Sequence, residues 1–182
     1  MKMSWNNITE PFIESDKYVH VPDANLQNPF SGPVNVNGET HWYQNGLLHR
    51  EDGPAIEFPS GIKMWYRNGK RHRDDGPAIE YADGTKYWYQ HDRLHRDDGP
   101  AIEYADGTKY WYQHDRRHRD DGPAIEYADG TKEWYRNGKL HREDGPAKEF
   151  ANGDKYWYKN GVKISFLRRM WEKFTTVANA LN

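Results

Sequence analysis

The sequence predicts an all-β protein, a single antiparallel sheet of tandem 23-residue β-hairpin repeats. The first observation behind this prediction is a motif, Asp-Gly-Pro-Ala, that returns every 23 residues, and a constant period is the signature of a repeat architecture. The second is that each unit holds two short β-type runs around a turn. The motif begins at Asp52, Asp75, Asp98, Asp121 and Asp144.

The repeat array is expected to cover residues 32–161, about six units. A degenerate first copy opens at Gly32, and the copies at residues 75–97 and 98–120 differ at one position only. Such near-identity indicates a recent duplication within the array. Aromatic residues make up 15% of the chain and supply the large apolar surface that the few aliphatic residues do not.

Residues 77–89 show how one unit folds. Two β-type runs flank the turn Asp83-Gly84, which is a strong hairpin signal. Pairing across this turn places Glu80 opposite Lys86, and opposed charges on neighbouring strands stabilise a pair by about 0.2–1 kcal/mol. A one-residue slip would lose the pair in every unit. The same pair recurs as Glu57/Lys63, Glu103/Lys109, Glu126/Lys132 and Glu149/Lys155.

A second turn follows the second run of each unit. It is Asn-Gly in four units, and this dipeptide suits the positive φ angles of a type I′ turn. In the duplicated units, His91-Asp92 and His114-Asp115 stand in its place. The proline of the next motif cannot donate a ladder hydrogen bond, so the chain must bend or bulge there. The pattern leaves open whether a unit has two strands or three.

The two ends depart from the period. Residues 1–31 are aperiodic and are expected to form an irregular N-terminal cap over the first hairpin. Residues 162–182 carry apolar side chains at three- and four-residue spacing, which predicts a C-terminal amphipathic helix capping the last hairpin. This helix could instead bind a partner groove, support self-association through Trp171 and Phe174, or lie at a membrane interface.

The composition excludes several function classes. A net charge of −2 does not suit a protein that binds nucleic acid or anionic membranes by charge neutralisation. The absence of cysteine removes thiol nucleophiles and thiolate metal sites and suits a reducing compartment. No signal-like or membrane-spanning apolar run occurs. We therefore expect a cytoplasmic protein of bacterial or host-cell location. No catalytic constellation or cofactor site is predicted.

The repeat resembles the variant MORN repeats of bacterial, phage and giant-virus proteins. The matching residues are the aromatic and glycine pattern of residues 127–138 and the His-Arg-Glu-Asp-Gly-Pro-Ala run of residues 141–147. The resemblance implies a meandering sheet coiled into an open, solenoid-like trough that acts as a protein-binding scaffold, and some such proteins are antitoxins. It implies no catalytic residue. Because this chain lacks the glycine-rich His-Gly-x-Gly stretch of ordinary MORN units, the lipid binding attributed to some members does not follow.

Two polar columns recur with the period. Histidines of successive units would stand about 10 Å apart, which is too far for two of them to share one zinc ion. They are therefore predicted to be structural, hydrogen-bonded or stacked beside a tryptophan, with no metal. The adjoining arginines are predicted to pair with the aspartate that opens the next motif. The two columns are His49, His72, His95, His118 and His141, and Arg50, Arg73, Arg96, Arg119 and Arg142.

Tryptophans that never vary between units are predicted to pack unit on unit as the structural repeat core, whereas positions that vary are candidates for partner contact. The core set is Trp65, Trp88, Trp111, Trp134 and Trp157. The candidate partner-binding set is Met64, Arg71, Tyr87, Tyr110, Arg117 and Tyr156. The sequence predicts a non-enzymatic scaffold that binds an unknown protein target, as an antitoxin-like or phage-encoded inhibitor. A carbohydrate-binding module with exposed aromatic rows is the alternative, and an inert face remains open.

Overall fold

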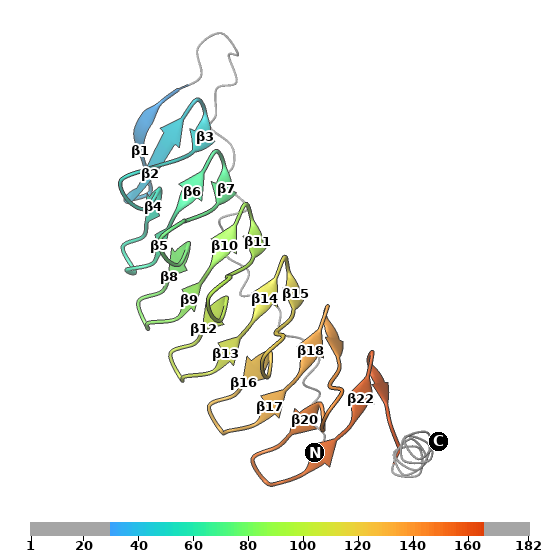
Figure 1. Cartoon of the computed structure of the whole chain (residues 1–182). Coiled ribbons are helices and arrows are strands. Elements are labelled where there is room, and N and C mark those ends of the chain that lie inside the picture. Colours follow the sequence, from blue (N-terminus) through green and yellow to red (C-terminus); the bar gives the residue numbers. More distant parts are fainter. Residues whose placement is uncertain (1–29, 166–182) are drawn as a thin grey trace.

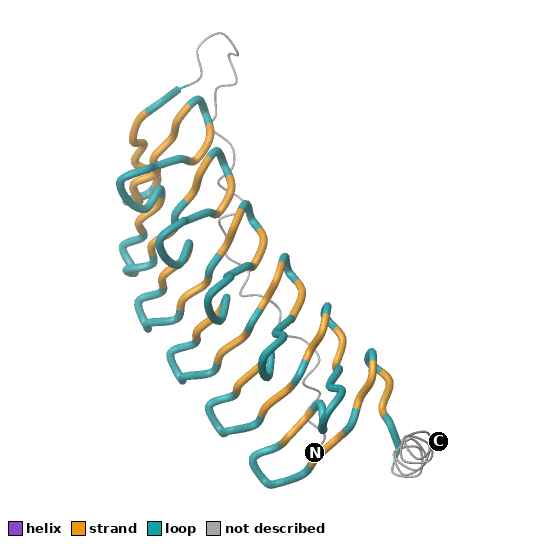
Figure 2. Tube along the Cα trace, viewed as in Figure 1, coloured by secondary structure: helices purple, strands orange, loops and turns teal. Residues whose placement is uncertain are grey.

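The structure, a computed structural model, describes residues 30–165. They form a curved stack of β-hairpins (Figure 1). This part of the chain contains strands and turns but no helix, which confirms the all-β prediction. The hairpins follow one another in sequence order along one curved axis, and every unit repeats the same path (Figure 2). Residues 1–29 of the predicted cap (1–31) and residues 166–182 of the predicted helix (162–182) lie outside the described residues.

A 13-stranded antiparallel sheet runs the length of the array. The first unit contributes three of its strands and each later unit contributes two. Consecutive hairpins pair with each other, so the ladder continues from unit to unit. Its strands are β1 (Gly32–Val36), β2 (Glu39–Gln44), β3 (Leu47–Leu48), β4 (Ile56–Glu57), β5 (Lys63–Met64), β8 (Ile79–Glu80), β9 (Lys86–Tyr87), β12 (Ile102–Glu103), β13 (Lys109–Tyr110), β16 (Ile125–Glu126), β17 (Lys132–Glu133), β20 (Lys148–Glu149) and β21 (Lys155–Tyr156).

The predicted register of the hairpin is confirmed. Glu80 lies opposite Lys86, and Ile79 lies opposite Tyr87. On its other side, Lys86 also lies opposite Glu103 of the following unit. Glutamates and lysines therefore alternate strand by strand along the long sheet, and most of these lysines have a glutamate on each side. We call this row the charge ladder, and it comprises Glu57, Lys63, Glu80, Lys86, Glu103, Lys109, Glu126, Lys132, Glu149 and Lys155.

From the second unit on, the second turn closes a separate two-stranded ribbon, whereas in the first unit it joins β2 to β3 within the long sheet. Each of these later units thus contains four short strands, more than the two or three that the sequence left open. The ribbons are β6–β7 (Tyr66–Arg67 and Lys70–Arg71), β10–β11 (Tyr89–Gln90 and Arg93–Leu94), β14–β15 (Tyr112–Gln113 and Arg116–Arg117), β18–β19 (Tyr135–Arg136 and Lys139–Leu140) and β22–β23 (Tyr158–Lys159 and Val162–Lys163). Because β23 is a strand, the array continues past residue 161, and the expected helix does not begin at residue 162.

Each tryptophan marks the bend between long sheet and ribbon. The Trp65 amide donates to the Ala78 carbonyl of the next unit, while its carbonyl accepts from the His72 amide at the end of its own ribbon. The peptide groups of this residue therefore join sheet, ribbon and neighbouring unit. Neighbouring ribbons are joined as well, because the Asp92 amide donates to the Arg71 carbonyl at 3.0 Å.

The core is a single cluster of buried side chains from both the long sheet and the ribbons. Ile79 and Tyr87 of the long sheet and Tyr89 and Leu94 of a ribbon are all buried in it. Edge-to-face tyrosine pairs connect the units, as between Tyr87 and the following Tyr104, whose ring centroids are 6.1 Å apart. Each unit therefore completes its core with side chains of its neighbours, the usual solution of repeat proteins.

One junction breaks the apolar pattern. Glu133 takes the place of a tyrosine, and Lys148 takes the place of an isoleucine directly opposite it. Lys148 Nζ donates to Glu133 Oε1 at 2.7 Å, and the Tyr135 hydroxyl donates to Glu133 Oε2 at 2.8 Å. The Glu133 side chain is 8% exposed, so its charge depends on these two partners.

Candidate binding surface

The corner that opens each unit is built around one arginine. Arg73 Nε donates to Asp75 Oδ1 at 2.9 Å, and Arg73 Nη1 donates to Glu80 Oε1 at 3.1 Å. The guanidinium also covers the Trp65 ring at 4.1 Å from its centroid. A planar cation with five donors can make all these contacts at once, which a lysine cannot.

The same arrangement repeats along the array. The predicted pairing of each arginine with the motif aspartate is confirmed at distances of 2.8–3.1 Å. The sequence did not predict the stacking on tryptophan, with guanidinium-to-centroid distances of 4.0–4.3 Å. The stacked pairs are Arg50–Trp42, Arg73–Trp65, Arg96–Trp88, Arg119–Trp111 and Arg142–Trp134.

The five tryptophans predicted as the repeat core lie outside the buried core cluster. Each ring is half-buried at the bend between sheet and ribbon, and the amides of all but Trp157 donate to a carbonyl of the next unit. After Trp157 the arginine position is occupied by Ser165 and the histidine position by Ile164. The corner chemistry therefore ends with the last complete unit.

The corner aspartates are held in their ionised form. The hydrogen bond from Arg73 and the charge of its guanidinium lower the pKa of Asp75 below its usual range. Hydrogen bonds from His72 and Arg67 likewise lower the pKa of Asp74. These carboxylates are exposed, yet each already has a cationic or hydrogen-bonding partner within the chain.

The histidines are hydrogen-bonded within the chain, as predicted. His72 Nε2 lies 2.8 Å from Asp74 Oδ1, and His72 Nδ1 accepts from the His91 amide at 3.3 Å. In the two duplicated units the turn histidine stacks on this column, with ring centroids 4.4 Å apart for His72 and His91. Within residues 30–165, no group of three or more His, Asp or Glu side chains is placed to hold a metal ion.

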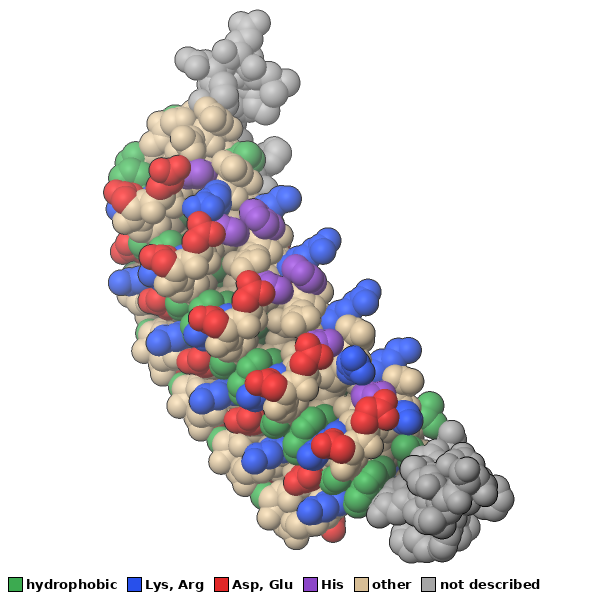
Figure 3. Space-filling model, viewed as in Figure 1, with side chains coloured by type: hydrophobic (Ala, Val, Ile, Leu, Met, Phe, Trp, Pro, Cys, Tyr) green, Lys and Arg blue, Asp and Glu red, His purple; other side chains and the backbone are tan. Residues whose placement is uncertain are grey.

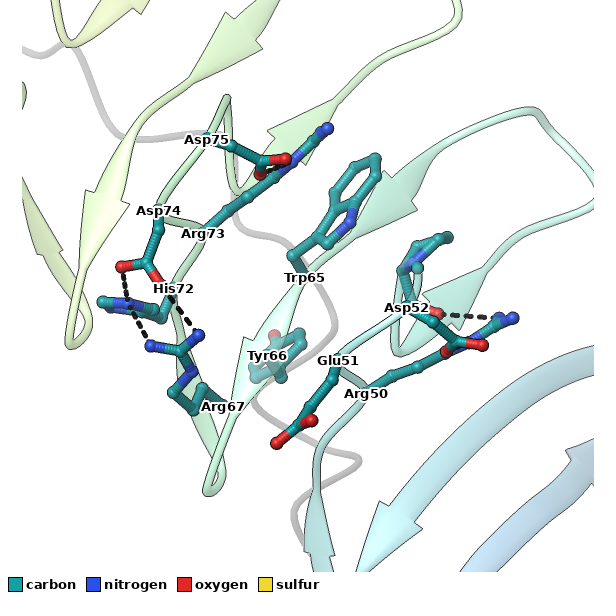
Figure 4. Close-up of a pocket in the computed structure, with 12 residues that line it drawn as sticks. Arg50, Glu51, Asp52, Trp65, Tyr66, Arg67, His72, Arg73, Asp74 and Asp75 are labelled. Atoms are coloured by element: carbon teal, nitrogen blue, oxygen red, sulfur yellow. Dashed lines mark hydrogen bonds and ion pairs between the residues drawn. The ribbon is translucent and has the colours of Figure 1, made fainter.

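A groove of about 510 Å³ separates the first two corners (Figure 4). Arg50 and Asp52 line one side, Arg73 and Asp75 line the other, and Trp65 stands between them. All these polar groups bond to one another or to neighbouring backbone. His72 and Asp74 also line the groove, and they too are engaged with each other, at 2.8 Å between His72 Nε2 and Asp74 Oδ1.

The structure corrects the predicted partner-binding set at three positions. Met64, Tyr87 and Tyr110 are 0%, 3% and 5% exposed, so no partner reaches them in this structure. They are buried because each lies opposite an isoleucine and shares its face of the long sheet. Burial also raises the pKa of Tyr87 and of Tyr110. Tyr156, at the last hairpin, is half-buried against Phe150.

The two arginines of the predicted set are half-buried and engaged within the chain. Arg71 Nε donates to Asp92 Oδ1 at 2.9 Å, and its guanidinium lies 4.1 Å from the Tyr89 ring centroid. Arg117 Nε donates to the Tyr112 hydroxyl at 3.3 Å and its guanidinium lies over the Tyr135 ring. Both side chains pack ribbon against ribbon, so little of either is presented to a partner.

The exposed cations of the ribbon turns were missed from the sequence. Four exposed basic side chains stand at equivalent places, one in each of ribbons β6–β7, β10–β11, β14–β15 and β18–β19, and no carboxylate of the described chain pairs with them. Figure 3 shows basic side chains at the projecting edge of the array, beside a separate row of acidic corners. We call these four the tip row, and they are Lys70, Arg93, Arg116 and Lys139. The signal was a column that stays basic in four units while Leu47 and Val162 occupy it at the ends.

The fold and its surface define a tandem β-hairpin repeat protein with three charged rows along its length, namely the charge ladder, the corners and the tip row. No protein-family model matches the sequence, and no curated protein matches it either. None of the described residues forms a helix long and apolar enough to cross a membrane.

Proposed function

We propose that this protein is a non-enzymatic scaffold of the MORN-like kind that binds another protein along its array. The observation that carries the proposal is the repetition of one exposed charged pattern, unit after unit, at the corners and ribbon tips. An enzyme needs one special site, whereas a pattern of this kind favours an elongated partner that contacts several units. Biologically, we propose an antitoxin-like or phage-encoded inhibitor that acts in the cytoplasm.

The alternative is a carbohydrate-binding module with its tryptophans as stacking platforms. The partly exposed Trp65 and its equivalents favour it, because sugar faces stack on exposed rings. The arginine that covers each ring weighs against it, since a sugar would have to displace a guanidinium held by two carboxylates and a carbonyl. Protein binding is therefore the better-supported function.

The length of the array provides the test. Deleting residues 98–120 removes one complete unit and leaves neighbours that differ from the original ones only at the position of Leu94 and Arg117. The tagged full chain is used to isolate a partner, which is then purified and titrated by calorimetry against the full chain and the shortened chain. We expect a partner that contacts several units to bind the shortened chain at least tenfold more weakly.

Two results would count against the scaffold function. Equal affinity for both lengths would indicate a single local site. Retention of the full chain on purified polysaccharide, competed by soluble sugar, would favour the carbohydrate module. Inhibition is tested separately by measuring the activity of the purified partner at increasing molar ratios of the array. We expect this activity to fall until a fixed stoichiometry is reached.

A further inference from the structure

The tip row has neither an ion pair nor a carboxylate across the strand pair, which sets it apart from the corner arginines and the charge ladder in the described array. The corner arginines bind aspartates, Arg67 binds Asp74, and Arg71 binds Asp92. The lysines of the charge ladder lie opposite glutamates. By contrast, the four tip side chains are exposed and without an internal counter-charge. Folding leaves their charge available to something outside the chain.

Two tips also carry like charges across the ribbon. Arg67 lies opposite Lys70, and Arg136 lies opposite Lys139. Like charges directly opposite each other destabilise a strand pair. Arg67 also binds Asp74, whereas Lys70, Arg136 and Lys139 have no carboxylate partner among the described residues, which favours a role in binding.

The backbone beneath the tip row is held in place. In the two central ribbons, Asp92 and Asp115 adopt φ angles of 67° and 65°, which are unfavourable for residues other than glycine. Side-chain hydrogen bonds offset this strain, because Asp92 Oδ1 accepts from the Arg71 amide at 2.9 Å and Asp115 Oδ1 accepts from the Leu94 amide at 2.8 Å. The cations at these tips are therefore presented from a fixed backbone.

The spacing of the row limits its partner. Successive ribbons are one unit apart, or two strand spacings, about 10 Å. Seven residues of an α-helix advance about 10.5 Å, and residues seven apart lie close to the same face. In an extended strand, residues three apart span a similar distance but point to opposite faces. A helix with carboxylates at every seventh residue can therefore meet four tips in register.

The acidic corners weigh against a nucleic acid. Asp97 follows Arg93 by four residues, so their Cα atoms are at most about 14 Å apart. Each corner presents two exposed carboxylates beside the tip row. A helix is about 10–12 Å wide and fits on the tips alone, whereas a wider polyanion would also meet the corner charges.

We propose that the tip row binds an acidic helical segment of a partner protein whose carboxylates recur every seven residues. This inference rests on the scaffold function proposed above and names its surface and the chemistry of its partner. It replaces the buried side chains of the predicted set with Lys70, Arg93, Arg116 and Lys139 as the contact residues.

The test uses two synthetic helical peptides of 28 residues with identical composition. The striped peptide has two glutamates per seven residues, four positions apart on one face, and the scattered peptide distributes them around the helix. Binding to the full chain is measured by fluorescence anisotropy at physiological salt. We expect the striped peptide to bind at least tenfold more tightly than the scattered one, with an affinity that falls as salt rises.

Two variants of the full chain supply the matched comparison. The tip variant carries Lys70→Gln, Arg93→Gln, Arg116→Gln and Lys139→Gln. The control variant carries Lys63→Gln, Lys86→Gln, Lys109→Gln and Lys132→Gln, which remove the same number of positive charges at the same spacing from the charge ladder. Circular dichroism checks that both fold. We expect the tip variant to lose at least tenfold in affinity for the striped peptide and the control variant to lose less than threefold.

Several outcomes would overturn the tip proposal. These are equal binding of the two peptides, an equal loss in both variants, or tighter binding of an oligothymidine of matched charge. Binding of the natural partner distinguishes the tip proposal from the scaffold proposal. If it binds the tip variant as well as the original chain but still requires the full array length, the tip assignment fails and the scaffold function stands.

Discussion

The long sheet and the ribbon tips belong to the same 23-residue unit, yet they use charge in opposite ways. On the sheet, Lys86 lies between Glu80 and Glu103, so the charges balance within the fold. At the tips, Arg93 has no carboxylate partner among the described residues, and its equivalents Lys70 and Lys139 lie opposite further cations. We therefore interpret the paired charges as serving the stability of the fold and the unpaired charges as available for binding a partner.

The largest expected effect lies in the core of the sheet. Ile79→Ala should lower the free energy of unfolding by about 2–5 kcal/mol, because it opens a cavity beside Tyr87 in a fully buried position. Urea denaturation followed by tryptophan fluorescence measures this. The neighbouring exposed substitution Lys86→Ala should cost less than about 1 kcal/mol. Equal losses would contradict the assignment of the two faces.

The polar junction gives the next effect. Lys148→Ala should cost about 2 kcal/mol, since it leaves the buried Glu133 carboxylate without its cation. The double substitution Glu133→Tyr with Lys148→Ile restores the apolar pair of the other units and should recover that loss or exceed it. Thermal denaturation of the single and double variants tests the prediction. A double variant that is less stable than Lys148→Ala would refute it.

Two arginines three residues apart allow a direct comparison of corner and tip. Arg96→Ala should cost about 1–3 kcal/mol, because it uncovers Trp88 and removes the hydrogen bonds to Asp98 and Glu103. Arg93→Ala at the tip should change the unfolding free energy by less than about 0.5 kcal/mol. Chemical denaturation of both variants decides the matter. A tip arginine as costly as the corner one would mean that it has a structural role.

The smallest expected effect is the acid sensitivity of the corners. The bonded Arg73 lowers the folded-state pKa of Asp75, so the ionised carboxylate stabilises the fold above its unfolded pKa of about 3.9. That contribution is lost as the pH falls through the folded-state value. Unfolding free energies measured between pH 6 and pH 3 should fall less steeply for Asp75→Asn than for the original chain. Identical slopes would show that the pair does not favour folding.

Much of the fold could be predicted from the sequence because its signals are local. The turn Asp83-Gly84 and the recurring Glu80/Lys86 pair specify one hairpin register, and the structure has it. The arginine-to-aspartate pairing could also be predicted, since Arg73 and Asp75 are two residues apart in the sequence. Contacts between units were harder. The bond from the Trp65 amide to the Ala78 carbonyl joins one unit to the next, and no local pattern reveals it.

The candidate site was predicted less well for a physical reason. Variation between units was taken as a sign of exposure, but Met64 and Tyr87 vary because a packed column tolerates side chains of different shape. The alternation of side chains between the two faces of a strand could have predicted this burial. Ile79 opposes Tyr87, and cross-strand partners share a face, so the tyrosine belonged with the isoleucine in the core.

The near-identity of residues 75–97 and 98–120 has a consequence for how the chain reaches its fold. During refolding, the hairpin of residues 121–143 can dock on either copy with almost the same chemistry. Docking on the earlier copy leaves a whole cassette looped out, and the chain must detach to correct the mistake. Such a skipped-unit state is a kinetic trap, and making the two copies less alike is the way to remove it.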